Sequence, residues 1–247
     1  MTENFPAKGE TATNEYAVQV IATIQTDFDS KFGIPRQSGI VDSSIGVIRF
    51  EPAYRSPEAL RGLSGFSHLW LIWLFSENMG KGWSPTVRPP KLGGNTRMGV
   101  FATRSPFRPN PIGLSSVRLL EIQTDGKDTP RLIVSGADLM NGTPIIDIKP
   151  YVPYTDLHPE ALGGFALPGN AHRLQVDFPP KLLAKVPQEK QSALMETLAQ
   201  DPRPGYVEDA GRIFGLSFAG MEVRFSVEGD RLQVVEIQPG FIRREGS

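Results

Sequence analysis

The spacing of apolar residues predicts a chain whose first two thirds are built mainly of short β-strands. Glycine (25 residues) and proline (22 residues) cluster between these apolar segments, as is typical of turns that join strands. Strands this regular, without long helices between them, favour a closed β-barrel or a sandwich. The strands are predicted over residues 16–26, 46–50, 69–75, 98–103, 114–123, 131–137 and 144–149.

Two segments of this region have a distinct pattern. The run Leu-Trp-Leu-Ile-Trp-Leu-Phe at residues 69–75 lacks alternation, which predicts a strand covered on both faces. It is much shorter than the ~20 residues needed to cross a bilayer. A short helix is predicted over residues 57–63, because Ser56 can cap it and Pro57 suits its first turn.

The pattern changes after residue 167. Leucines recur at helical spacing, which predicts a helix over residues 188–200 that Pro202 closes. Strict alternation over residues 221–227, followed by a Glu-Gly-Asp turn and a returning strand over residues 231–237, predicts a hairpin, and a further strand precedes it at 214–218.

We therefore expect a mainly β protein with three parts. Residues 1–15 would form a disordered lead, residues 16–165 an N-terminal β-barrel domain and residues 166–247 a small C-terminal α+β domain. The lead lacks a charged segment followed by an apolar core, so we expect a cytoplasmic protein without a secretory signal and without a membrane partner.

Composition excludes several classes of site. The 247 residues carry a net charge of −1, so any nucleic-acid binding must come from a local basic patch. The absence of cysteine excludes disulfides, thiolate nucleophiles and Cys-ligated metals. The three histidines are scattered along the chain, and we expect no metal site.

The segment from residue 102 to residue 115, Ala-Thr-Arg-Ser-Pro-Phe-Arg-Pro-Asn-Pro-Ile-Gly-Leu-Ser, is the strongest candidate for chemistry. Its three prolines exclude a helix or a central strand and predict a stiff loop. A stiff loop that carries Arg104 and Arg108 suits an anion or nucleotide pocket. On pattern alone, a surface loop with two solvated arginines is an equally good interpretation.

Three further irregular segments, at residues 35–37, 88–97 and 138–147, share this mixture of proline, glycine, arginine, amide and acid. Loops of a barrel converge at its rims, so we expect the four segments to meet at one site. The chain has no GxGxxG turn before a helix, no P-loop and no HExxH motif. The predicted site thus binds and orients a polar ligand and has no obvious nucleophile.

These loops closely resemble the TrmO (YaeB/TsaA-like) family. The resemblance covers about residues 31–156 and is carried by Phe-Gly-Ile-Pro-Arg-Gln-Ser-Gly at 32–39, by the arginine loop, and by Asp-Leu-Met-Asn-Gly-Thr-Pro at 138–144. Ala-Gln-Asp-Pro-Arg-Pro-Gly-Tyr at 199–206 is similar to the family's C-terminal element. The family's members look like S-adenosylmethionine-dependent methyltransferases that modify N6 of threonylcarbamoyladenosine at position 37 of tRNA.

The resemblance implies a non-Rossmann β-barrel, a small C-terminal domain and a homodimer that holds S-adenosylmethionine near the subunit interface. It places the cofactor contacts on Pro35, Arg36, Gln37, Ser76, Glu77, Arg104, Leu114, Asp138, Leu139, Met140 and Asn141.

The substrate side implied by the resemblance is the anticodon loop of tRNA. N6 of the modified base belongs to a urea-like linkage and is a poor nucleophile, so a carboxylate that takes its proton would help; Asp138 or Asp147 is the candidate. Arg104 and Arg108 suit the carboxylate of either the cofactor or the threonyl group. The candidates for tRNA contacts are Arg97, Arg108, Asn110 and Arg203.

Two other functions stay open. A non-catalytic nucleotide- or RNA-binding adaptor on the same barrel is compatible with Ser76, where relatives commonly have His, and Asn141, where they frequently have Asp. A phosphohydrolase that uses the arginine loop is disfavoured, because the sequence shows no cluster of metal ligands.

Overall fold

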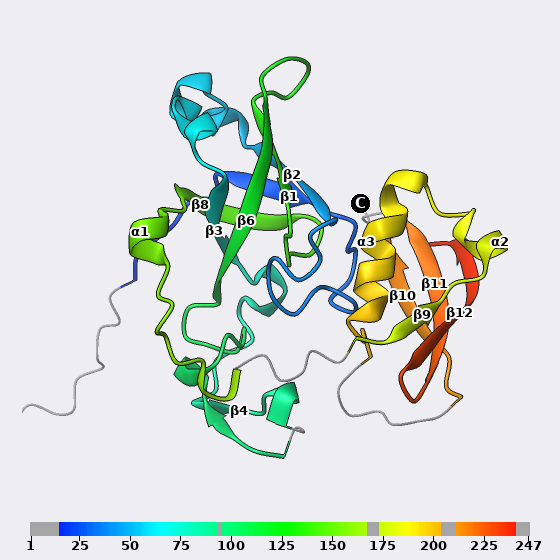
Figure 1. Cartoon of the computed structure of the whole chain (residues 1–247). Coiled ribbons are helices and arrows are strands. Elements are labelled where there is room, and N and C mark those ends of the chain that lie inside the picture. Colours follow the sequence, from blue (N-terminus) through cyan, green and yellow to red (C-terminus); the bar gives the residue numbers. More distant parts are fainter. Residues whose placement is uncertain (1–14, 93–94, 167–172, 204–210, 241–247) are drawn as a thin grey trace, which may run out of the picture.

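The structure is a computed structural model that describes residues 15–92, 95–166, 173–203 and 211–240 (Figure 1). Among these residues, antiparallel strands close into a β-barrel in the first two thirds of the chain, as predicted. The strand order around the barrel is β1-β2-β7-β6-β3-β8. The strands are β1 (Ala22–Gln25), β2 (Ile45–Phe50), β3 (His68–Leu74), β6 (Ile112–Gln123), β7 (Arg131–Ser135) and β8 (Thr143–Pro150).

Alternate side chains of these strands fill the barrel. Ile48, Leu71 and Leu132 are completely buried, because successive residues of a strand point to opposite faces. The prediction that β3 is covered on both faces is only half right, since its buried residues alternate with half-buried ones. On the outer face, Trp70 packs against Tyr151 and is only partly covered.

Two predicted strands are shorter in the structure because most of their residues have no neighbouring strand. The segment 16–26 is β-strand only over β1, and Tyr16 is exposed. The segment 98–103 contributes only β5 (Met98–Gly99), which pairs with β4 (Thr86–Val87) in a ribbon outside the barrel. A 3₁₀ helix, Val100–Ala102, follows.

The predicted helix at 57–63 is wrong in type. Two 3₁₀ helices, Pro57–Leu60 and Leu63–Gly65, replace it, because Gly62 takes a left-handed φ of 86° between them. Ser56 precedes the first but makes no side-chain capping bond. The remaining short elements are the helix α1 (Pro153–Asp156) and the 3₁₀ helices Pro52–Tyr54, Ser76–Asn78, Pro90–Leu92 and Gly164–Ala166.

The C-terminal domain is a sheet of order β10-β11-β12-β9 covered by a helix. Its predicted hairpin and its predicted helix are both present, and Leu194 and Leu198 of that helix enter the same buried cluster as Leu216 of the sheet. The elements are β9 (Gln175–Asp177), α2 (Pro180–Leu183), α3 (Gln188–Ala199), β10 (Phe214–Phe218), β11 (Met221–Glu228) and β12 (Arg231–Pro239).

The two domains share part of one core. The chain leaving β1 carries Phe28 into the C-terminal core, where its ring lies 5.6 Å from that of Phe218. The Asp27 carboxylate forms an ion pair with Lys190 on α3, with 2.7 Å between Oδ2 and Nζ. The Asp27 carbonyl accepts a hydrogen bond from the Ala219 amide. The expected boundary at residues 165–166 therefore separates the two domains in the sequence, but Phe28, from the N-terminal side of this boundary, packs in the C-terminal core.

Two sequence-based expectations concern segments at the limits of this description. All but the last residue of the predicted disordered lead lies outside the described residues. Within the described part of the chain, no helix has the length and apolar character needed to cross a membrane.

Candidate active site

A cavity of about 620 Å³ opens where β3 ends and β6 begins. Three of the four irregular segments meet there: the loop around Pro35, the arginine loop before β6 and the segment that begins at Asp138. The turn that follows β3, with Ser76 and Glu77, supplies another wall. The described residues of the fourth segment, 88–97, do not line this cavity, because the segment connects β4 to β5 outside the barrel.

Most of the predicted site residues are brought together here. Arg36, Arg104 and Asp138, which lie far apart in the sequence, all line the cavity. The predicted residues that line it are Pro35, Arg36, Gln37, Ser76, Glu77, Arg104, Arg108, Asn110, Leu114, Asp138 and Met140.

Two predicted cofactor contacts, Leu139 and Asn141, do not line the cavity. Leu139 is buried in the barrel core, because it alternates with its neighbours Asp138 and Met140. Asn141 holds the chain that leaves β1: its Nδ2 donates to Asp29 Oδ1 at 3.0 Å and its Oδ1 accepts from the Thr26 amide at 3.3 Å. An amide can donate and accept at once, which a carboxylate at this position could not do.

The structure does not bring Asp147 to the cavity. A β-bulge interrupts the pairing of β3 with β8 between Ile72 and Trp73, and Asp147 pairs with Ile72 on the outer side of the barrel. Its carboxylate forms a 2.8 Å ion pair with Lys149. Asp138 is therefore the remaining candidate for a base.

The two outlying arginines also lie elsewhere. Arg97 is exposed beside the β4–β5 ribbon, where its Nη1 donates to Thr86 Oγ1 at 2.9 Å. Arg203 lines a second, smaller cavity at the junction with the C-terminal domain.

Asp138 ends a chain of two hydrogen bonds, the first of them buried and the second partly buried. Trp73 Nε1 donates to Ser115 Oγ at 3.0 Å, and that hydroxyl donates to Asp138 Oδ1 at 2.5 Å. Burial raises the pKa of the Asp138 carboxyl, and the hydrogen bond from Ser115 and the charge of Arg104 only partly offset this. A carboxylate with a raised pKa is a stronger base than an ordinary aspartate.

The cationic side of the cavity is held in place by neighbouring polar groups. Arg104 donates to the side-chain carbonyl of Gln37 and thereby joins two loops. Arg108 Nη1 donates to the Thr103 carbonyl at 3.2 Å. On the wall beside them, Glu77 lies 3.8 Å from Lys31, so the cavity presents groups for both an anion and a cation.

Sequence reasoning missed the aromatic and hydrogen-bonding wall of the cavity. Trp73 pairs with Gly113 across β3 and β6, and a Cβ on Gly113 would lie 2.2 Å from the indole. A glycine within a strand often marks such a close approach, and this was the available signal. The residues missed in this way are Trp73, Phe75, Gly113 and, behind them, Ser115.

No group of three or more histidine, aspartate or glutamate side chains that could hold a metal ion occurs among the residues described.

Comparison with known proteins gives a consistent picture. A family model described as the tRNA-methyltransferase O N-terminal domain matches residues 23–157, and one described as the TrmO C-terminal domain matches residues 171–240. A tRNA (adenine(37)-N6)-methyltransferase of Escherichia coli K12 is 40% identical over 234 residues, which cover 92% of this chain and 99% of that protein.

Another relative with the same name, from Eikenella corrodens, is 45% identical over 164 residues, covering 66% of this chain and 92% of its own. A crystal structure of TrmO from Pseudomonas aeruginosa superposes with a TM-score of 0.74 at 33% identity, covering 94% of this chain and all of that one. The two matched domains, in the same order and over most of the chain, show that this protein belongs to the TrmO family.

Proposed function

We propose that this protein is an S-adenosylmethionine-dependent methyltransferase that methylates N6 of threonylcarbamoyladenosine at position 37 of tRNA. The observation that carries the proposal is a single cavity, in a TrmO-family barrel, lined by Arg36, Arg104 and the partly buried Asp138. It joins anion-binding groups to a partly buried proton acceptor.

The cavity fits the cofactor in size and in charge. Its volume of about 620 Å³ lies within the range of roughly 300–1,000 Å³ usual for small-ligand sites. Arg36 and Arg104 would hold the carboxylate of the methionyl part, since guanidinium groups match carboxylates in geometry. Glu77 would attract the ammonium group, and Trp73 would offer its ring to the sulfonium or the adenine.

The chemistry asks for positioning and for one proton transfer. The bound cofactor supplies an electrophilic methyl group on a sulfonium. Asp138 would accept the N6 proton while N6 forms its bond to the methyl carbon and the carbon–sulfur electron pair stays on sulfur. The raised pKa of Asp138 makes this proton transfer more favourable. Arg108 and Asn110 line the same cavity and would hold the threonyl carboxylate.

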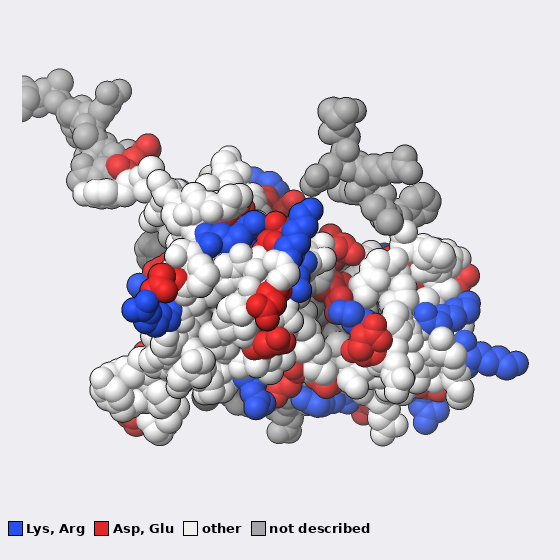
Figure 2. Space-filling model, turned by 90° about the horizontal axis from the view of Figure 1, so that it is seen from above, with Lys and Arg blue, Asp and Glu red and all other residues white. Residues whose placement is uncertain are grey.

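The tRNA would be bound by local contacts and not by the overall charge. Figure 2 shows basic and acidic side chains interspersed over the face that it draws, consistent with a net charge of −1. We expect a moderate affinity for tRNA that falls with salt. Because its substrate is tRNA, we place the protein's action in the cytoplasm.

A homodimer is part of the proposal. Large apolar side chains are exposed near the cavity, among them Phe101, which is 74% exposed, and Phe107. The Phe107 carbonyl accepts a hydrogen bond from Ser84, next to the half-exposed Trp83. Exposed apolar groups gathered in this way are typical of an interaction surface. Sedimentation of the wild type and of Phe101→Glu would show whether the dimer uses this face.

The decisive experiment incubates the protein with S-adenosylmethionine and threonylcarbamoyl-modified tRNA, then measures the nucleosides by mass spectrometry. We expect one methyl group in place of one hydrogen on the modified nucleoside. We expect Asp138→Asn to lower kcat about 10²–10⁴-fold, the usual contribution of a general base, without a matching loss of cofactor affinity. Asp147→Asn, outside the cavity, is the matched control and should keep its turnover.

The competing adaptor function predicts a different result. A protein that binds S-adenosylmethionine and tRNA in titrations but adds no methyl group would be an adaptor. Unchanged turnover in Asp138→Asn would remove Asp138 as the base and leave the methyl transfer to positioning alone.

A further inference from the structure

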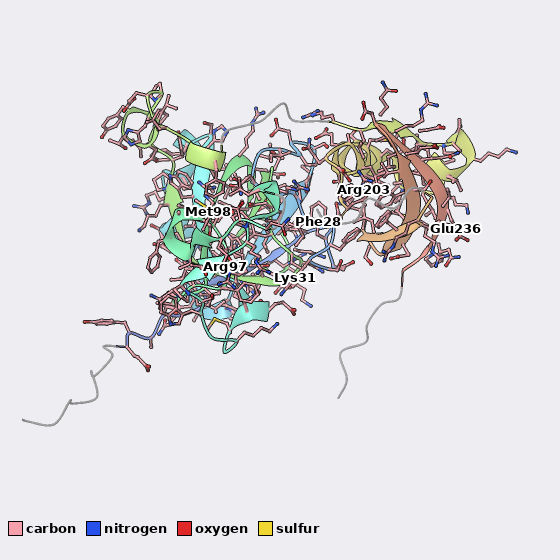
Figure 3. The ribbon with its side chains drawn as sticks, turned by 90° about the horizontal axis from the view of Figure 1, so that it is seen from below. Phe28, Lys31, Arg97, Met98, Arg203 and Glu236 are labelled. Carbon is pink, nitrogen blue, oxygen red and sulfur yellow. The ribbon has the colours of Figure 1, made fainter. Side chains whose placement is uncertain are left out.

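A second cavity, of about 290 Å³, lies where the barrel and the C-terminal domain meet. The barrel contributes the segment from Lys31 to Arg36, and the C-terminal domain contributes the end of α3 and the residues up to Arg203. Lys31, Ile34, Pro35 and Arg36 line this cavity and the larger one, so the two cavities adjoin. Figure 3 places Phe28, Lys31 and Arg203 along this junction.

The second cavity is basic on both of its walls. Lys31 and Arg36 come from the barrel, and Arg203 comes from the C-terminal domain. Asp201 fixes the guanidinium of Arg203 through two hydrogen bonds of 2.8 Å, from Nε and from Nη2. A side chain held in this way loses little freedom when it binds an anion.

The backbone of Asp201 supports the same role. Asp201 follows the end of α3 and has a φ of 52°. Its amide donates to the Leu198 carbonyl at 3.2 Å. Glycine or asparagine is usual at such a position, because other side chains are strained there. Burial alone would raise the pKa of Asp201, but the hydrogen bonds and charge of Arg203 and the charge of Arg36 lower it, so the carboxylate stays ionised. Arg36 lines the same cavity as the Asp201–Arg203 pair.

Apolar residues form much of the rest of the cavity wall, beside the polar Thr197 and Gln200. Phe32, Val41, Pro90 and Pro202 line it between the charged groups. Charged donors beside an apolar wall suit a nucleotide, whose phosphate needs the former and whose sugar and base can lie on the latter.

We propose that this second cavity binds a phosphate, with part of its nucleotide, of the RNA strand next to the methylated nucleoside, and that Arg203 holds the phosphate. The proposal rests on the proposed function for its RNA partner. It makes the C-terminal domain a part of the substrate site that sets the position of the RNA strand relative to the larger cavity.

The test measures the binding of an anticodon stem-loop RNA to the wild type and to Arg203→Met over a range of salt concentrations. It measures binding alone and does not depend on methyl transfer. We expect an affinity about 10- to 100-fold lower, the usual effect of losing hydrogen bonds from a charged group. We expect the salt slope to be shallower by roughly 0.7, the loss of one phosphate contact in single-stranded RNA. The affinity for S-adenosylmethionine should be unchanged, because Arg203 does not line the larger cavity.

Arg224→Met is the matched control. Arg224 lies on β11 and pairs at 3.3 Å with Glu236, which Figure 3 places on the far side of the C-terminal sheet from the junction. This variant should bind the RNA as the wild type does. Arg203→Lys tests geometry, since it keeps the charge and loses the pair of bonds to Asp201; we expect an affinity between those of wild type and Arg203→Met.

Three outcomes would overturn the proposal. The first is RNA affinity and salt slope in Arg203→Met equal to those of the wild type. The second is that Arg203→Met loses S-adenosylmethionine affinity and thermal stability together with its RNA affinity, which would make Arg203 a structural residue. The third is Arg203-dependent binding of free AMP without any effect on the stem-loop, which would indicate a site for a free nucleotide. A wild type that binds RNA through Arg203 but never methylates it would refute the proposed function and leave this inference standing.

Discussion

Asp138 is an acid whose environment favours its neutral form. It is held by Ser115 at the wall of the larger cavity, and burial raises the pKa of its carboxyl. The folded protein therefore retains this proton at pH values where the unfolded chain has lost it. It follows that the free energy of unfolding falls as the pH rises from the ordinary value of 3.8 through the raised one.

This fall in the free energy of unfolding with rising pH leads to a prediction for Asp138→Asn. The amide keeps an acceptor for Ser115 and has no charge to bury, so the variant should be more stable than the wild type at neutral pH. At a pH below the ordinary value, where the wild-type carboxyl is also neutral, the difference should vanish. Thermal unfolding of both proteins across this pH range measures it. A variant that is less stable at neutral pH would mean that the ionised carboxylate stabilises the fold.

At the scale of elements, the pairing of β3 with β6 builds the cavity wall. Gly113 lies opposite Trp73, and the indole occupies the space that a side chain on Gly113 would need. The same indole donates to Ser115, which donates to Asp138. The position of Trp73 thus determines both the shape of the cavity and the hydrogen bonds that lead to Asp138.

We predict that Gly113→Ala weakens cofactor binding. The added methyl group must displace Trp73, and overpacking of this kind costs about 1–3 kcal/mol. Calorimetry with S-adenosylmethionine should show roughly a tenfold loss of affinity, since 1.4 kcal/mol corresponds to a factor of ten. Gly65→Ala, where a Cβ meets no atom within 4 Å, is the control and should bind as the wild type does. Equal binding by both variants would show that the indole can move without consequence.

At the scale of the whole molecule, the two domains are joined through the segment that follows β1. Phe28 is 0% exposed and belongs to the C-terminal core, although the sequence places it among the barrel strands. Gly33 packs on Leu216 of β10, and the next residues, Ile34 to Arg36, line the larger cavity. The C-terminal domain therefore holds one wall of the larger cavity in position.

We predict that Phe28→Ala lowers the stability of the C-terminal domain by about 3–5 kcal/mol, the usual cost of truncating a buried phenylalanine. Hydrogen exchange should show the loss in α3 and β10 before it appears in the barrel strands. Phe66→Ala, at a partly exposed position of the barrel, is the control and should cost less. If the protection of the C-terminal elements stayed unchanged, the two domains would be independent in stability.

The sequence by itself determined much of this protein. Alternation along residues 221–227 specified a strand that the structure confirms, because one face of that strand must be buried. The stiff arginine loop identified the cavity, because proline restricts the backbone locally. The TrmO family motifs were recognisable without a structure, since they are long stretches of contiguous sequence.

Only the tertiary structure decided what depends on partners distant in the chain. Residues 98–103 have the propensity of a strand, but pairing restricts the strand to β5, in a ribbon outside the barrel. A bulge in β8 separated Asp147 from Asp138, and alternation buried Leu139 between two residues of the cavity. Phe28 packs in the C-terminal core, and Arg203 and Arg36, from the two sides of the domain junction, line one cavity. Local preference acts within a few residues, whereas register, burial and the meeting of loops arise only when the chain closes on itself.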